Sequence, residues 1–238
     1  PFVGRDEVIR QMRAHVADPA VAAIVVTAAA GTGKTRLVQA LSAMAPIPPL
    51  WIRASPAVAS IPLGAIADLV DLEGLDAGAT HRRVAGAVAE AGGVVVVDDL
   101  PHLDARTADL LHRLAESGEA TIVGTARTGT EVPPWLEWLW LDERTCHIEL
   151  GPLGPEAIDE LVGLVLDGIS PSDRRAVVST LSERTAGNAL FVRELLADLA
   201  RRRAAGEPVA LEARAPAHLL RVLDARLRAA GPTVAEPL

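Results

Sequence analysis

The sequence feature that most constrains the fold is a glycine-containing loop between an apolar run and a helical pattern. Residues Val21 to Thr27 are continuously apolar and rich in β-branched side chains, which is typical of a buried parallel strand. Gly31-Thr32-Gly33-Lys34-Thr35 follows, and a helical pattern runs from Lys34 to about Met44. Glycines let backbone N–H groups turn inward as an anion nest, and a helix N-terminus adds positive potential there. The sequence therefore predicts a strand–loop–helix unit that can hold an anion.

These residues predict a P-loop, a nucleotide phosphate site. Lys34 is expected to reach the β- and γ-phosphates, and Thr35 to bind Mg²⁺. The rest of the predicted phosphate cradle consists of Ala30, Gly31, Thr32, Gly33 and Arg36. The full pattern has a glycine at position 28, where this chain has Ala28, which is tolerable only if its φ stays negative. The alternative is a glycine-rich turn without a ligand.

A second motif consists of two acids that follow a strand. Val94 to Val97 predicts a buried strand, and Asp98-Asp99 comes next. The carboxyl ends of parallel strands share one edge of a sheet, so both acids are expected beside the P-loop. Asp98 is the predicted Mg²⁺-side acid, acting through a water, and Asp99 is predicted to orient or deprotonate the attacking water. Alternatively, both are turn residues at a strand end.

A third strand brings a cation to the same edge. The strand 121–125 leads into Thr125-Ala126-Arg127, and Arg127 is predicted to sense the γ-phosphate through charge-assisted hydrogen bonds. The alternative is a surface arginine on a loop. Two strands thus deliver polar residues to one edge, with an extra strand, Leu50 to Arg53, between the P-loop and the acidic strand.

Strands that alternate with helices predict an α/β fold, a five-stranded parallel sheet with helices on both faces. The fifth strand is expected over 147–150. Helices are expected over 6–16, 62–72 and 80–91, and from Asp104 to about Ser117.

After Gly151-Pro152 the pattern contains only helices, beginning at Pro155, Ser170-Pro171 and Asn188, with another over 219–229. We therefore expect a nucleotide-binding domain over 1–151, a helical domain over 152–205, and a linker with the start of another domain over 206–238.

Charge and composition limit the partners. The 238 residues carry a formal net charge of −8, so no basic footprint predicts direct nucleic acid binding by this chain. The longest apolar run, Val21 to Ala30, is too short to cross a bilayer. A single cysteine, Cys146, excludes an internal disulfide and favours a cytoplasmic location. Because the chain starts at Pro1, we expect it to be part of a longer protein.

Several short sequence motifs, here called boxes, occur in the same order as in one known family. Phe2-Val3-Gly4-Arg5 resembles the N-terminal "FVGR" box of STAND ATPases, the AAA+-related branch. The P-loop, the acidic strand with Asp104, the Thr-x-Arg triplet and Leu150-Gly151-Pro152-Leu153 follow in the family's order. The segment 185–191 resembles the family's "GNPLFV" box. Together these boxes resemble the ATPase domain of large LuxR-type (MalT-like) bacterial transcriptional regulators.

This resemblance implies a role and further site residues. It implies ATP or ADP with Mg²⁺ as ligands, Phe2, Val3 and Arg5 near the adenine or ribose, and Asn188 as a cofactor-binding residue. It also implies a helical lid over 152–205, a winged-helix-like domain starting near 215, and C-terminal sensor and helix-turn-helix domains in the parent protein. Nucleotide-dependent self-association is a further implied partner interaction.

Two residues differ from the family pattern, and two other functions are also compatible with the sequence. Ala189 replaces a proline that lies against the adenine in the family, and Asp99 is shorter than the catalytic glutamate of vigorous AAA+ ATPases, so slow hydrolysis is expected. One rival function is a module that binds ADP or ATP without hydrolysis. Another is an AAA+ ATPase of the origin-binding or helicase-loader type, which would predict DNA-stimulated activity.

Trp135, Trp138 and Trp140 either form a partner surface or cover the end of the sheet.

Overall fold

The computed structural model describes residues 2–206, which divide into two compact units after Gly151. The first unit contains Phe2 and residues 4–151, and the second contains Val3 and the described residues from Pro152 onward. The helix predicted over 219–229 and the winged-helix-like segment lie outside the described residues. Over the described range, no helix is both long and apolar enough to cross a membrane.

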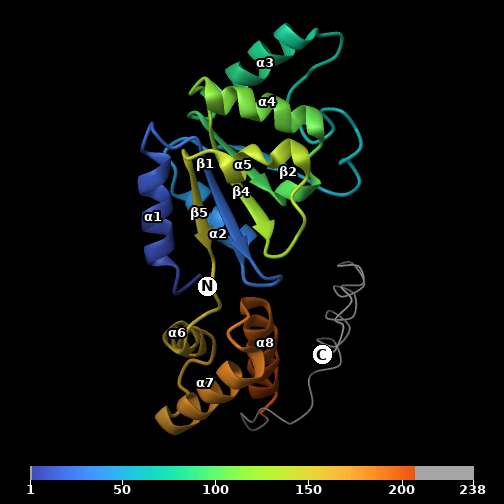
Figure 1. The fold of residues 1–238 in the computed structure, drawn as a ribbon. Helices are drawn as coiled ribbons and strands as arrows, with labels where there is room; N and C mark the ends of the chain where they lie inside the picture. The colour runs from blue at the N-terminus through green and yellow to red at the C-terminus, as the bar shows by residue number, and fades with distance from the viewer. Residues whose placement is uncertain (1, 207–238) are drawn as a thin grey trace, which may run out of the picture. The chain divides into compact units, whose positions relative to one another are not determined.

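The first unit is built on a five-stranded sheet in which every strand pair is parallel (Figure 1). The strand order is β2-β3-β4-β1-β5, which confirms the predicted parallel α/β sheet. The strands are β1 (Ala23–Ala28), β2 (Leu50–Arg53), β3 (Val94–Asp98), β4 (Thr121–Arg127) and β5 (Thr145–Glu149). In the sheet β4, and not the strand Leu50–Arg53, separates the P-loop strand from the acidic strand, which corrects the expected arrangement.

Helices cover both faces of this sheet, because successive strand residues point to opposite sides. Ile24 and Val26 of β1 belong to one core with α1 (Asp6–Val16) and α2 (Lys34–Ala43). Ala23 and Val25 belong to the opposite core with α3 (Ala77–Glu90) and α4 (Ala105–Glu116). These four strand residues have no exposed surface. A strand buried on both faces must be apolar throughout, which explains the run seen in the sequence.

Short helical turns complete this unit: η1 (Leu100–His102), η2 (Pro134–Leu136) and α5 (Trp138–Leu141). Trp138 and Trp140 pack against the core on the α3–α4 side. Trp135 is 41% exposed, and its indole Nε1 donates to the Leu103 carbonyl at 3.1 Å. Trp138 and Trp140 are partly buried against this core, which favours the covering role over the partner surface.

The prediction of a helix over 62–72 is wrong. The segment forms successive turns, in which Gly64 N–H donates to Ile61 O and Ile66 N–H donates to Leu63 O. Leu63 has a φ of 61°, and a residue at positive φ interrupts a right-handed helix. Ile66 and Val70 are nevertheless buried. The apolar spacing thus identified the inward side chains but not the backbone conformation.

The second unit contains α6 (Pro155–Val165), α7 (Pro171–Thr185) and α8 (Ala189–Ala204) around one apolar core. The last two helices begin where the sequence predicted, and Ser170 and Asn188 are their N-caps, because their side-chain oxygens accept hydrogen bonds from first-turn N–H groups. Between α7 and α8, Gly187 has a φ of 72°, and a Cβ there would lie 2.4 Å from the Leu153 carbonyl oxygen. A glycine is therefore required at this position.

Candidate nucleotide-binding site

The predicted P-loop is the turn between β1 and α2. Gly31 and Gly33 have φ angles of 80° and 104°, which other residues adopt only with strain. The Thr32 hydroxyl donates to the Ala29 carbonyl at 2.9 Å and holds the turn closed. Ala28 is the last residue of β1, pairs with Arg127 in register, and does not have a positive φ. The alanine at position 28 is therefore tolerated, because its φ is not positive.

The N-terminus of α2 is open to an anion. Its N-cap is Gly33, which offers no side-chain oxygen, and its first turn contains no acid. By contrast, Asp76 and Asp104 cap α3 and α4, on the other face of the sheet, with their carboxylates. Uncapped first-turn N–H groups need an acceptor, and the helix dipole favours a negative one. The geometry of this turn suits a phosphate group.

Lys34 lies across the loop. Its Nζ donates to the carbonyls of Ala28 at 2.7 Å and Ala29 at 3.0 Å. Burial, and next the nearby Arg127 guanidinium, lower the pKa of Lys34, while Asp99 and Asp98 oppose this shift. Arg127 is exposed at the end of β4, close enough to Lys34 for charge repulsion to lower the lysine pKa. A partly buried lysine with an exposed arginine nearby is favourable for binding a polyanion.

Three secondary-structure elements meet at the carboxylate of Asp98. The hydroxyl of Thr35, in the first turn of α2, donates to Asp98 Oδ1 at 3.0 Å. The hydroxyl of Thr125, on β4, donates to the same oxygen at 2.7 Å. Thr125 Oγ1 also accepts a 2.9 Å hydrogen bond from the Asp99 backbone N–H. The predicted Mg²⁺-side residues Thr35 and Asp98 are thus brought together.

Asp99 has an unusual backbone conformation. Its φ and ψ are 69° and 55°, in the left-handed region, where a non-glycine residue is strained. Its Oδ2 lies 3.8 Å from His102 Nε2, in the turn η1. The sequence predicted the role of Asp99 but gave no role in binding or catalysis to His102 or Thr125. The signal for Thr125 was its place two residues before Arg127 at a strand end.

The donor set near Thr35 and Asp98 fits Mg²⁺ and does not form a complete metal cage. Hydroxyl and carboxylate oxygens are the ligands that Mg²⁺ prefers, with phosphate oxygens and waters completing its octahedron. Within residues 2–206, no group of three or more His, Cys, Asp or Glu side chains could hold a metal ion by itself. Any Mg²⁺ here would need phosphate oxygens as ligands, which is the arrangement of a nucleotide site.

The remaining predicted site residues lie in both units. Arg5 is buried at the start of α1, donates from Nη2 to the Gly151 carbonyl at 2.8 Å, and burial lowers its pKa. Phe2 packs beside the α1–α2 core, and Val3 is buried. Arg36 is exposed on α2. Asn188 caps α8 in the second unit. Their contacts with a base or ribose stay predictions.

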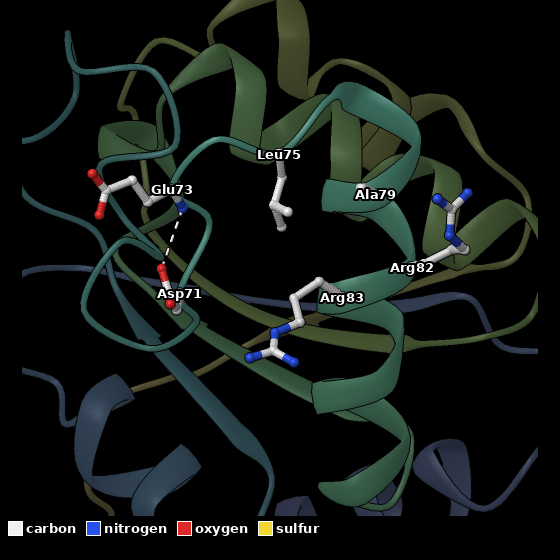
Figure 2. Close-up of a pocket in the computed structure, with 6 residues that line it drawn as sticks. All are labelled: Asp71, Glu73, Leu75, Ala79, Arg82 and Arg83. Carbon is white, nitrogen blue, oxygen red and sulfur yellow. Dashed lines mark hydrogen bonds between the residues drawn. The ribbon is translucent and has the colours of Figure 1, made fainter.

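A separate hollow of about 390 Å³ lies between α3 and the loop before it (Figure 2). Figure 2 shows acids on the loop side and arginines on the helix side. The hollow is lined by Asp71, Glu73, Leu75, Ala79, Arg82 and Arg83. It shares no residue with the P-loop or with Asp98, so the phosphate chemistry belongs to the loop and not to this hollow.

Known structures resemble this chain, although neither a protein-family model nor a curated protein sequence matches it. A Signal Transduction ATPase with Numerous Domains (STAND) protein with a tetratricopeptide repeat sensor, from Pyrococcus horikoshii, matches with a TM-score of 0.58 at 16% identity. The match covers 94% of this chain and 32% of that protein.

Two origin-recognition proteins also match. The ORC1 protein of Aeropyrum pernix, in complex with DNA, has a TM-score of 0.57 at 19% identity, over 96% of this chain and 66% of that one. Drosophila ORC bound to DNA has a TM-score of 0.54 at 18% identity, over 100% of this chain and 69% of that one. At such identities the likenesses show the fold alone. The chain has the fold of P-loop ATPases, the fold that STAND and ORC1-like AAA+ proteins share.

Proposed function

We propose that this chain is an ATP-binding switch module that hydrolyses ATP slowly. The observation that carries the proposal is the hydrogen-bonded network in which Asp98 accepts from Thr35 and Thr125. This network joins the P-loop helix, the acidic strand and the strand that ends in Arg127. A turn that was only glycine-rich would not need hydroxyl and carboxylate groups assembled at its side. The uncapped N-terminus of α2 supports the same conclusion.

In this proposal each residue has a separate task. Lys34 exchanges the carbonyls of Ala28 and Ala29 for β- and γ-phosphate oxygens, and Arg127 neutralises charge on the γ-phosphate. Thr35 and Asp98 would hold Mg²⁺, and the bound ion would neutralise charge on the phosphate oxygens. Asp99 accepts a hydrogen bond from the attacking water and takes its proton. The short reach of an aspartate at this position supports slow turnover.

The finer role rests on the family boxes. The order of boxes from Phe2 to Phe191 and the STAND likeness together support a regulator of the LuxR type, in which residues 152–205 act as a nucleotide-dependent lid. The chain spans about a third of the STAND protein that it matches. Sensor and helix-turn-helix domains would therefore lie elsewhere in a parent protein.

The first test is nucleotide binding by the purified chain. Any released nucleotide is identified after denaturation, and fluorescent ATP and ADP are then titrated with Mg²⁺. We expect micromolar or tighter binding that is lost in Lys34→Ala and retained in Arg83→Ala, which removes an exposed cation on α3. Equal affinity in the Lys34 variant and the parent would contradict a P-loop site.

The second test separates hydrolysis from binding alone. We expect Asp99→Asn to stop phosphate release while nucleotide affinity stays within about threefold of the parent. Asp68→Asn, at an exposed aspartate of the loop after β2, is the matched control. No phosphate release from the parent would favour the rival module that binds nucleotide without hydrolysis.

A second candidate function is supported by the two origin-recognition structures, which were solved with DNA. An origin-binding ATPase would hydrolyse ATP faster in the presence of duplex DNA. The net charge of −8 opposes direct DNA binding by this chain. Phosphate release with and without duplex DNA decides between the two functions, and stimulation by DNA would replace the regulator proposal.

A further inference from the structure

The P-loop lysine is the only lysine in this chain. Of 23 cationic lysine and arginine residues, 22 are arginines, and Lys34 is the exception. An arginine guanidinium stays protonated and does not undergo the acylation that lysine amines undergo. Any chemistry that acylates a lysine ε-amine in this chain is therefore confined to the phosphate loop.

We propose that Lys34 is a self-acylation site for acyl phosphates, the mixed anhydrides of a carboxylic acid and phosphoric acid. This inference rests on the proposed function, because it uses the same phosphate cradle. The left-handed glycines Gly31 and Gly33 and the uncapped N-terminus of α2 offer N–H groups to a phosphate group. An acyl phosphate bound through its phosphate carries its acyl carbon one bridging oxygen away from the cradle.

Lys34 is placed to react with such a ligand. Its Nζ lies over the loop, bonded to the carbonyls of Ala28 and Ala29, and its side chain is only partly buried. The neutral amine attacks the acyl carbonyl carbon, a C–N bond forms, and the bond between that carbon and the bridging oxygen breaks. Inorganic phosphate leaves, and the amine proton passes to solvent. No oxidant, reductant or further co-reactant is needed.

Acylation would act as an off switch for nucleotide binding. The resulting amide has no charge and one donor, so it cannot attract the β- and γ-phosphates as the ammonium does. The added acyl group also occupies space at the phosphate cradle. Conversely, a bound nucleotide would cover the cradle and protect Lys34. The acylated fraction would therefore depend on the ratio of acyl phosphate to ATP and ADP.

The experiment uses acetyl phosphate and an internal reference lysine. Arg83→Lys introduces a second, exposed lysine on α3, a helix whose N-terminus is already capped by the Asp76 carboxylate. Peptide mass spectrometry then compares acetylation of Lys34 with acetylation at position 83 in the same molecules. We expect Lys34 to react at least about tenfold faster with acetyl phosphate, because binding raises the local donor concentration. A phosphate-free donor, N-hydroxysuccinimidyl acetate, should show no such preference.

Two further measurements complete the test. Saturating ADP with Mg²⁺ should slow acetylation of Lys34 at least about tenfold and leave position 83 unaffected. The acetylated chain should lose binding of fluorescent ADP. A Lys34 rate equal to or below that at position 83, or unchanged ADP binding after acetylation, would overturn the inference.

The outcomes distinguish this inference from the proposed function. If the untreated chain binds ADP through Lys34 but acetyl phosphate shows no preference for it, the acylation inference fails and the nucleotide site stands. If Lys34 is acetylated preferentially but the untreated chain binds neither ATP nor ADP, the acyl phosphate site stands, while the proposed function fails together with the off switch that depends on it.

Discussion

The Thr125 hydroxyl donates a 2.7 Å hydrogen bond to Oδ1 of Asp98, across the boundary between β4 and β3. The same hydroxyl accepts from the Asp99 backbone N–H at 2.9 Å. One buried side chain thus fixes both acids, the first through its carboxylate and the second through its backbone. The left-handed conformation of Asp99 is held by this contact, so Thr125 connects the Mg²⁺-side acid with the acid predicted to activate water.

Replacing Thr125 by valine tests this connection. Valine has nearly the same shape and suits a strand, but it leaves the Asp99 N–H without its acceptor. We expect a loss of about 1–3 kcal/mol in the free energy of unfolding. Phosphate release should fall at least about tenfold, with nucleotide affinity changed less than hydrolysis. Urea denaturation and single-turnover kinetics measure these effects.

Thr121→Val is the matched control for Thr125→Val. It makes the same chemical change at the first residue of β4, at the other end of the strand from Asp98. Equal effects of the two variants would mean that strand packing, and not the hydroxyl bridge, explains the loss.

Ala28→Gly restores the glycine of the full P-loop pattern and tests whether its absence matters. Ala28 is 1% exposed and ends β1 in regular pairing with Arg127. A glycine there loses a buried methyl group and gains unfolded-state freedom, so we expect about 1–2 kcal/mol lower stability. Nucleotide affinity should not rise. A clear gain in ATP affinity would show that the alanine limits the pocket.

Local signals made much of the fold predictable. The helix over 6–16 and the strand over 50–53 have the predicted bounds. Asp104 caps α4 as its position before an amphipathic helix suggested. Gly31 and Gly33 adopt the left-handed angles that the motif requires. Each of these features depends on residues within a few positions of one another, which is why the sequence alone was sufficient.

Features that depend on distant residues were less predictable. The placement of β4 between β1 and β3 depends on which strands pair, and apolar periodicity carries no information about pairing partners. The bridging role of Thr125 follows from that order, because it places β4 next to β3 and so brings the Thr125 hydroxyl to Asp98. The segment 62–72 has helical spacing, but its backbone is turned by Leu63 at positive φ and bonded to a carboxylate from another element.

Cys146 offers a pH-dependent prediction outside the phosphate site. Burial, and next the charge of Asp18, raise the pKa of the Cys146 thiol. The thiolate is the form that reacts with a disulfide reagent. The labelling rate should therefore begin to increase at a higher pH in the folded chain than in the urea-unfolded chain. Asp18→Asn should move the folded profile part of the way back, with Asp6→Asn as the control. Rapid labelling of the folded chain at neutral pH would contradict a raised pKa for the Cys146 thiol.

Asp104→Asn tests how the turns after β2 are held next to the acidic motif. The Asp104 carboxylate is 2% exposed and accepts from four donors, the N–H groups of Leu63, Ala65 and Thr107 and the Thr107 hydroxyl. An asparagine keeps the shape but turns one acceptor oxygen into a donor amide, which then faces N–H groups that need an acceptor. We expect a loss of about 2–3 kcal/mol in the free energy of unfolding and faster hydrogen exchange at Leu63 and Ala65. Asp76→Asn, at the exposed N-cap of α3, should cost less because its oxygen accepts one hydrogen bond from Ala79 N–H and water can replace it. If the Asp104 variant exchanged those two amides no faster than the parent, the carboxylate would be a helix cap alone and would not hold the loop.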